Sequence, residues 1–212
     1  MTQATAEVLM PEEIWPEQGR WTYEDYLNLP DDDRYRYEII QGVLYVTNAP
    51  NINHQFTVME VAFQIKSFVN ENTLGYVLTA PFEVHLSEES RPVQPDVLFI
   101  PKERWPGPGA GYFRGGPDLI VEVLSPSTRR NDQVIKFMAY ENAKVSEYWL
   151  ADPGTRLVQV FTLDNQGYYQ LKGDYTGEDV IRSQVLPGLK IIADSLFKGP
   201  GKNALSRCAD TP

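Results

Sequence analysis

The stretch PDLIVEVLSPSTRRNDQVIKF, residues 117–137, decides the fold. Its first part is a run of apolar residues that is interrupted only by Glu122 and ends at a Ser-Pro pair, a pattern typical of a strand buried inside a sheet. Its second part predicts a helix over residues 131–142 with Asn131 as the N-cap. A carboxylate in a buried strand is costly unless it is paired or binds a metal, so Glu122 requires a partner.

The segment QPDVLFIP, residues 94–101, supplies that partner. It predicts a second central strand with apolar residues on both faces, and Asp96 stands at its start. If the two strands are neighbours, Asp96 and Glu122 can share one hard cation such as Mg²⁺. Gln94 points to the same side as Asp96 by the period-two alternation of a strand, and we assign it an accessory role in positioning water.

The remaining elements surround these two strands. The sequence predicts a helix from Thr22 to Leu29 with Thr22 as cap, a hairpin over 36–46 with a Gln41-Gly42 turn, and a long helix to about Asn70 capped by Asn51 or Asn53. The pattern predicts one broken strand or two short ones over residues 76–86. Residues 101–116 are rich in Gly and Pro and are expected to form a loop, either a functional flap or a mobile one. Three further strands are expected at 147–153, 157–163 and 168–171, the last two joined by a turn. This order indicates a mixed α/β fold, with a central sheet flanked by helices.

Length and composition indicate one domain. The chain has 212 residues, of which 42% are hydrophobic and 12% aromatic, enough for a single substantial core. We expect this domain to cover residues 21–198, with flexible tails at 1–20 and 199–212, where the residues are small, polar or proline and lack periodicity.

Several function classes are disfavoured by composition. The single cysteine, Cys208, excludes an internal disulfide and disfavours a zinc cluster or a thiol nucleophile, and two histidines cannot form a histidine-rich site. Any metal must therefore be held by carboxylates. The N-terminus has neither a basic region nor a sustained apolar run, so we expect a cytoplasmic protein without a membrane anchor.

The net charge of −10 fits poorly with a protein that binds nucleic acid, because phosphates usually meet a basic surface. Basic residues are nevertheless close to Glu122 in the sequence. Arg129 and Arg130, just before the predicted helix over 131–142, are the candidates for substrate binding, and Lys136 follows on that helix.

The string from Pro117 to Pro153, with PDVLFIP, EIIQGVLYV and the segment Pro50 to His54 before it, resembles the Uma2 (DUF820) family. The resemblance covers roughly Thr22 to Phe197. It implies a restriction-endonuclease-like core of the PD-(D/E)XK nuclease superfamily, with Mg²⁺ or Mn²⁺ as cofactor and DNA as substrate. Many enzymes of this superfamily cut as dimers, so the resemblance also implies a homodimer.

The chain departs from the superfamily pattern at one position. A lysine is expected two residues after Glu122, and Leu124 stands there. In Uma2-like sequences a lysine recurs on the following helix, so the resemblance implies that Lys136 replaces it and supports the attacking water or the developing charge. The resemblance also places Glu38 in the metal site as a third acid after Asp96 and Glu122.

Other polar residues have two interpretations each. Asp132 either reaches the site or forms a local ion pair with Lys136, and Asp118 either joins the Glu122 face or only opens its strand. His54 is more simply a capping or solvent-facing residue than a catalytic base. Core packing is the simplest role of Tyr140 and residues 147–149, and a solvated turn that of residues 31–33.

The leading hypothesis is an endonuclease that hydrolyses phosphodiester bonds of DNA through metal-activated water, with Asp96, Glu122, Lys136 and Glu38 as catalytic residues. The alternative is a catalytically inactive module of the same fold that binds nucleic acid or a protein. Retention of a charged Glu122 in a buried strand argues against the inactive module. A hydrolase of another phosphate ester is a third possibility.

Overall fold

The computed structural model describes residues 15–32, 34–48 and 50–199, and its centre is a six-stranded sheet in the order β10-β9-β8-β7-β5-β3. The strands are β3 (Gly75–Thr79), β5 (Val97–Pro101), β7 (Leu119–Val123), β8 (Glu147–Asp152), β9 (Leu157–Leu163) and β10 (Tyr169–Tyr175). Strands β7 and β8 are parallel and their other neighbours antiparallel, so the sheet is mixed. The predicted α/β class is confirmed.

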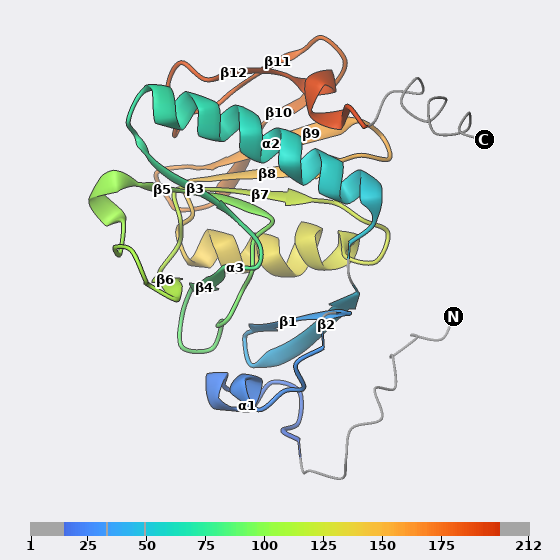
Figure 1. Ribbon diagram of the computed structural model, residues 1–212, viewed down its shortest axis with the longest axis vertical. Helices are drawn as coiled ribbons and strands as arrows, with labels where there is room; N and C mark the ends of the chain where they lie inside the picture. Colours follow the sequence, from blue (N-terminus) through green and yellow to red (C-terminus); the bar gives the residue numbers. More distant parts are fainter. Residues whose placement is uncertain (1–14, 33, 49, 200–212) are drawn as a thin grey trace, which may run out of the picture.

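Helices cover both faces of this sheet (Figure 1). Alternate β7 residues, among them Val121, pack with the long helix α2 (Ile52–Glu71), whereas Ile120 packs with the helix α3 (Phe137–Asn142). Period-two alternation therefore places Glu122 on the α3 face. Of the two predicted caps of α2, Asn51 and Asn53, the structure has Asn51, whose side chain accepts a hydrogen bond from the His54 amide.

The helix that crosses from β7 to β8 starts earlier than its sequence pattern predicts. Arg130 already has helical backbone angles, and no side chain caps Asn131, so the predicted Asn131 cap is wrong. The first turn is instead closed by Ser125, whose hydroxyl accepts from the Thr128 amide at 3.2 Å. Residues Asn131–Lys136 then form a π-helical segment before α3, a widened turn that is frequent at functional sites.

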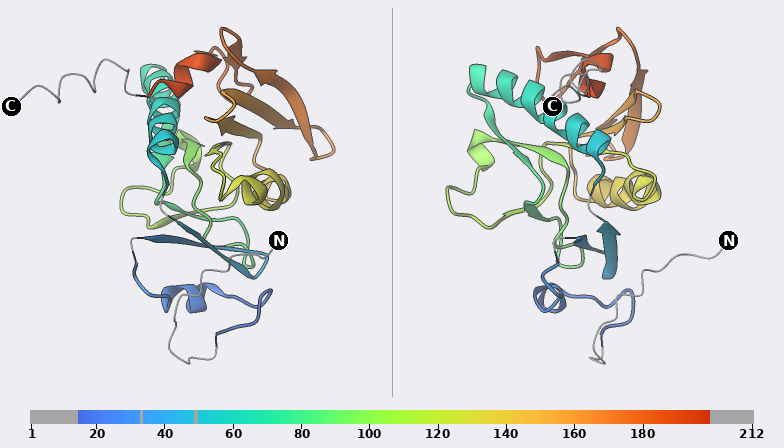
Figure 2. Two further views of the ribbon diagram at one scale, coloured as in Figure 1. Left: turned by 90° about the vertical axis from the view of Figure 1, so that its right-hand side faces the viewer. Right: turned by 45° about the vertical axis from the view of Figure 1, so that its right-hand side comes forward.

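A separate hairpin, β1 (Tyr35–Ile40) and β2 (Val43–Asn48), lies beside the main sheet together with the helix α1 (Tyr23–Leu27), as both views of Figure 2 show. The predicted turn is confirmed, since Gln41 and Gly42 both have positive φ, 52° and 69°. Thr22 caps α1 as expected.

The segment before α1 packs against this hairpin, so the prediction of a flexible tail is wrong for residues 15–20. The Gly19 amide donates to the Gly42 carbonyl at 2.8 Å, and the Trp15 and Trp21 rings stack with centroids 5.5 Å apart. A Cβ on Gly42 would come within 2.5 Å of the Gly19 carbonyl oxygen, which explains the need for glycine. The rest of that predicted tail, residues 1–14, lies outside the described residues, as do 200–212 of the other tail.

Two regions contain elements that the sequence pattern did not predict. The loop over 101–116 includes a short 3₁₀ helix, η1 (Lys102–Arg104), and a strand, β6 (Tyr112–Arg114), that pairs in parallel with β4 (Glu83–His85). After β10 come β11 (Val180–Arg182), β12 (Lys190–Ile192) and η3 (Ala193–Phe197), which complete the core on the α2 side. No helix in the described part of the chain has the length and apolarity needed to cross a bilayer.

Candidate active site

The two acids singled out by the sequence meet on neighbouring strands. Val97 of β5 pairs with Val121 of β7, so the antiparallel register continues to Asp96 opposite Glu122. The Asp96 amide donates to Oε2 of Glu122 at 3.3 Å. Both side chains are buried, with 4% and 1% of their residue surfaces exposed. The expectation that their strands are adjacent is confirmed.

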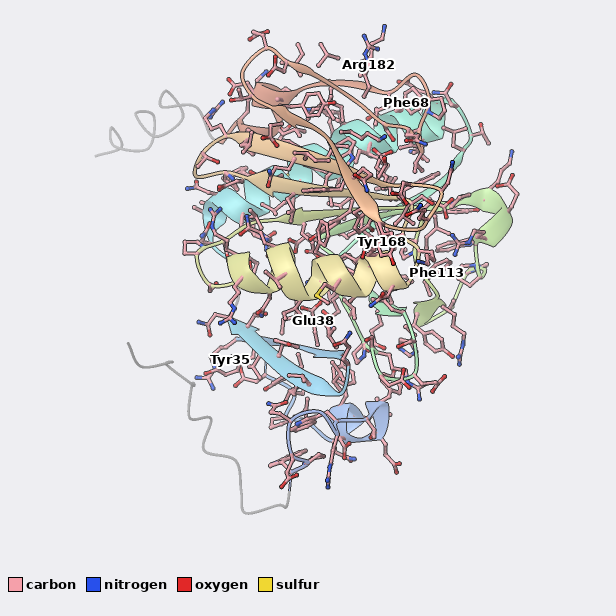
Figure 3. All side chains as sticks on the ribbon, turned by 180° about the vertical axis from the view of Figure 1, so that it is seen from behind. Tyr35, Glu38, Phe68, Phe113, Tyr168 and Arg182 are labelled. Carbon is pink, nitrogen blue, oxygen red and sulfur yellow. The ribbon has the colours of Figure 1, made fainter. Side chains whose placement is uncertain are left out.

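Lys136 lies between the acids of three elements. Its Nζ is 3.0 Å from Oε1 of Glu122 on β7, 3.0 Å from Oε2 of Glu38 on β1 and 3.8 Å from Oδ1 of Asp132 on its own helix. Figure 3 shows Glu38 between the hairpin and this helix. The structure therefore brings together Asp96, Glu122, Lys136, Glu38 and Asp132 in what we call the acid cluster.

Three neighbouring groups hold the Asp96 carboxylate in place. Its Oδ2 accepts from the Val123 amide at 3.0 Å and lies 3.0 Å from Nε2 of His54, and Arg36 Nη1 donates to its Oδ1 at 3.1 Å. His54 is 6% exposed, so the interpretation of a solvent-facing histidine is wrong. These contacts leave the Asp96 carboxylate little freedom to rotate.

The acids of the cluster differ in protonation. Burial opposes the charged form of Asp96, but His54, Arg36 and Lys136 outweigh it and hold the pKa of Asp96 well below its usual range. Burial, together with the neighbouring carboxylates, raises the pKa of Glu122 well above normal despite Lys136. Burial also raises the pKa of Asp132 to about 6. The neutral forms of Glu122 and Asp132 are therefore favoured in the metal-free protein, and a bound divalent cation would have to displace their protons.

Lys136 stays charged in this setting. Burial disfavours the ammonium, but the charges of Glu122, Glu38 and Asp132 outweigh this effect and raise the pKa of Lys136 above its ordinary value. A permanent cation is thus held against Glu122, the most deeply buried carboxylate of the acid cluster.

Tyr140 contributes more than the packing expected of it. Its hydroxyl donates to Oε1 of Glu122 at 2.6 Å, so the same oxygen accepts from Tyr140 and Lys136. The two donors are four positions apart on consecutive helical turns. Arg36 was also missed by the sequence prediction, although its spacing of two from Glu38 on a strand places both on one face.

The acid cluster forms the wall of a cavity of about 270 Å³. The hairpin supplies Arg36 and Glu38, the start of α2 supplies His54, and the turn after β7 supplies hydroxyl groups, among them Ser127 and Thr128. A substrate must enter this cavity to reach the carboxylates, because each is almost fully buried.

Two predicted accessory residues lie elsewhere. The Asp118 carboxylate pairs with Arg104, and Asp118 does not line the cavity. Gln94 reaches the site only through its backbone, where its amide donates to Oε1 of Glu38 at 2.7 Å. Its side chain donates to the Tyr26 hydroxyl at 3.4 Å instead of facing the Asp96 cavity.

The predicted substrate-binding arginines lie close to the cavity but outside its wall. Arg129 donates to Oδ2 of Asp152 at 2.8 Å, and Arg130, the next residue, is exposed. Neither lines the cavity. A role for them is therefore limited to parts of a substrate that extend out of it.

The donor set suits a hard divalent cation in its chemistry. Glu38, Asp96, Glu122 and Asp132 carry four carboxylates, while Lys136 and Arg36 are the permanent cations against them. Oxygen ligands from carboxylates, which ionise when the metal binds, are what Mg²⁺ or Mn²⁺ requires. Within residues 15–199, Asp33 and Ala49 apart, no three acidic, histidine or cysteine side chains already converge as a metal site. The side chains of the cluster would have to adjust on binding.

Comparison with known proteins adds a family and a fold. The model of the Uma2 family, described as "Putative restriction endonuclease", matches residues 23–194. An uncharacterized protein of Synechocystis sp. is 22% identical over 179 residues, which cover 83% of this chain and 90% of that protein.

A solved structure has the same fold. The crystal structure of "a putative nuclease belonging to DUF820" from Anabaena variabilis superposes with a TM-score of 0.69 and covers 83% of this chain and 97% of its own, at 20% sequence identity. The expected mixed α/β fold, with a central sheet flanked by helices, is thereby confirmed, and it matches the fold of this neighbour.

Proposed function

The chain belongs to the Uma2 family, and we propose that it is a metal-dependent nuclease that hydrolyses phosphodiester bonds of DNA at the acid cluster. The observation that carries this proposal is the position of Lys136, whose amine lies 3.0 Å from both Glu122 and Glu38. A buried cation held among acids from separate elements is costly to build and has no evident need in the fold itself.

The excess of carboxylates supports metal dependence. A phosphodiester is an anion, and the four carboxylates, once ionised, outnumber the two permanent cations and would repel it unless a metal were bound. Asp96, Glu122 and Glu38 are the residues that would hold Mg²⁺ or Mn²⁺. When bound, the cation would polarise a phosphoryl oxygen and lower the pKa of a coordinated water.

The residues of the chain then have separate roles. Hydrolysis adds water across a P–O bond, and negative charge accumulates on the phosphorus oxygens in the transition state. The Lys136 ammonium is placed to offset that charge, and Tyr140 holds the Glu122 oxygen that Lys136 also contacts. His54 and Arg36 are positioning residues, because they fix the Asp96 carboxylate.

Plasmid cleavage tests the activity. Purified protein with Mg²⁺ or Mn²⁺ is expected to nick supercoiled DNA. Addition of EDTA should stop the cleavage, and the Asp96→Ala variant should be inactive. The matched control is Asp118→Ala, which removes a carboxylate paired with Arg104 outside the cavity and is expected to retain activity. Cleavage that persists in Asp96→Ala would exclude this site.

Calorimetric titration with Mn²⁺ separates the enzyme from an inactive module. The nuclease proposal requires binding that is lost in Glu122→Ala. A protein that neither binds Mn²⁺ nor cleaves DNA would instead be a binding module built on the same fold.

A further inference from the structure

A second cavity, of about 520 Å³, meets the active-site cavity at the open end of the β1–β2 hairpin. Arg36 and Pro50 line both cavities. The two spaces lie on opposite faces of β1, since Glu38 faces the acid cluster whereas Tyr35 and Tyr37 face the second cavity. A chain-like substrate whose phosphate occupies the first cavity can therefore place its next unit in the second.

Three tyrosines, Tyr26, Tyr35 and Tyr37, form part of the wall, and we call this space the tyrosine pocket. The rings of Tyr35 and Tyr37 lie 6.5 Å apart at an angle of 41°. Figure 3 shows Tyr35 on the hairpin, on the opposite side of the α3 helix from the main sheet. Aromatic side chains at the border of a nucleic-acid site are the usual stacking partners of unpaired bases.

Tyr37 carries an unused polar group. The residue is 8% exposed, and its buried hydroxyl has no hydrogen-bond partner among the described residues. Buried polar atoms in folded proteins are nearly always satisfied. A ligand that enters the tyrosine pocket and rearranges its wall slightly could satisfy this hydroxyl.

The charges of the pocket select against a phosphate as its occupant. Asp31, Asp32 and Glu83 line it, with Arg36 as the cation at the junction with the active site. Arg34 pairs with Asp32 and offsets its charge. Asp31 and Glu83 would still repel an anion, whereas an uncharged base that offers amino groups would find acceptors on them. The pocket therefore fits a nucleobase and not the backbone.

We propose that the tyrosine pocket binds an unpaired nucleobase next to the scissile phosphodiester, so that the enzyme acts on single-stranded DNA or on frayed ends. This inference rests on the proposed nuclease function. A base inside a duplex is paired and stacked and must leave the helix to enter such a pocket.

Two further features favour a single strand. The carboxylates of Asp96, Glu122 and Glu38 are each at most 4% exposed, so a flexible backbone reaches them more easily than a stiff duplex. The chain carries a net charge of −10, so backbone attraction is weak and base stacking must supply more of the affinity.

Cleavage of a short labelled oligonucleotide with Mn²⁺ tests the proposal. The single strand is expected to be cut more efficiently than the same sequence in a duplex. An abasic site introduced at each position in turn should lower kcat/KM about tenfold at one position beside the cut and little elsewhere.

Variants of the pocket connect this effect to named residues. Tyr35→Ala should lower kcat/KM on the intact strand about tenfold and abolish the effect of the abasic site, since the base and its stacking partner act together. Tyr37→Phe keeps the ring and removes only the hydroxyl, and it should lower kcat/KM on the intact strand about fivefold. Tyr168→Ala, which removes a tyrosine that is 58% exposed outside the pocket, is the control and should cleave normally.

The outcomes distinguish the two proposals. Cleavage of single strand and duplex with equal efficiency, or a uniform response to abasic sites, would overturn the base pocket and leave the nuclease intact. No binding or cleavage of either DNA would overturn the nuclease function and the base pocket together.

Discussion

The amine of Lys136 lies 3.0 Å from Oε1 of Glu122, although the two residues are 14 positions apart in the chain. The β7 strand ends between them and the crossover helix turns back over the α3 face of the sheet. Leu124, at the position where the superfamily pattern places a lysine, is buried in the core on that face. The crossover helix therefore places the Lys136 ammonium beside Glu122, whereas the position just after the strand holds Leu124 in place of a lysine.

Replacement of this lysine tests its chemical role. Lys136→Met keeps most of the side-chain volume and removes the charge, and we expect kcat on DNA to fall by about 10²- to 10³-fold because the developing phosphoryl charge loses its partner. The control is Lys172→Met on the exposed face of β10, which should leave kcat unchanged. Wild-type rates in Lys136→Met would show that Lys136 has only a structural role.

Local patterns were sufficient to predict the centre of the site. Glu122 stood out as a charge within an apolar run and Asp96 as an acid before another, and both signals depend on residues a few positions away. The register that sets Asp96 opposite Glu122 needed only the assumption that the two strands are neighbours.

The contacts that complete the site depend on tertiary structure. His54 reaches Asp96 only because α2 begins at the end of the sheet where Asp96 lies, which no local pattern encodes. Period-two alternation places Asp118 on the same face as Glu122, yet the Asp118 carboxylate forms an ion pair with Arg104 of the preceding loop. The same limit explains the missed β6, whose three residues are too short a run to show a strand pattern and are held by parallel pairing with β4.

Glu147 has a structural role that the packing interpretation underestimates. Its Oε1 accepts from Trp149 Nε1 at 2.6 Å, and its Oε2 accepts from the amides of Gln184 and Val185 at 2.7 and 2.9 Å and from the Ser183 hydroxyl. All four partners donate, so this carboxylate ties β8 to the segment before β12.

Glu147→Gln should therefore destabilise the fold. Whichever way the amide is turned, its NH₂ group faces a buried N–H donor, and we expect a loss of about 2 kcal/mol in the free energy of unfolding. Urea denaturation followed by tryptophan fluorescence measures it. Glu71→Gln, an exposed change at the end of α2, is the matched control; equal midpoints for both variants would contradict the prediction.

Asp132 should give the metal-free protein a distinct dependence of stability on pH. Its pKa is raised from 3.8 to about 6, so its contribution to stability is fully present below pH 4 and is lost as the pH rises through 6. The difference in unfolding free energy between wild type and Asp132→Asn should shift by about 2 to 3 kcal/mol over this window, in favour of the variant at higher pH. Denaturation in EDTA at several pH values measures it, and a constant difference would refute the assignment.

His54 should determine how well Asp96 binds a metal. The imidazole fixes Oδ2 of Asp96 at 3.0 Å, and loss of such an orienting partner typically weakens metal binding about 10- to 100-fold. We expect His54→Ala to weaken Mn²⁺ binding by this amount in calorimetry and His54→Gln to restore part of it, because the glutamine amide can donate to the same oxygen. A histidine that only fills space would be replaced equally well by leucine, so His54→Leu separates the two roles. Wild-type affinity in His54→Leu would show that Asp96 is oriented by Arg36 and the Val123 amide alone.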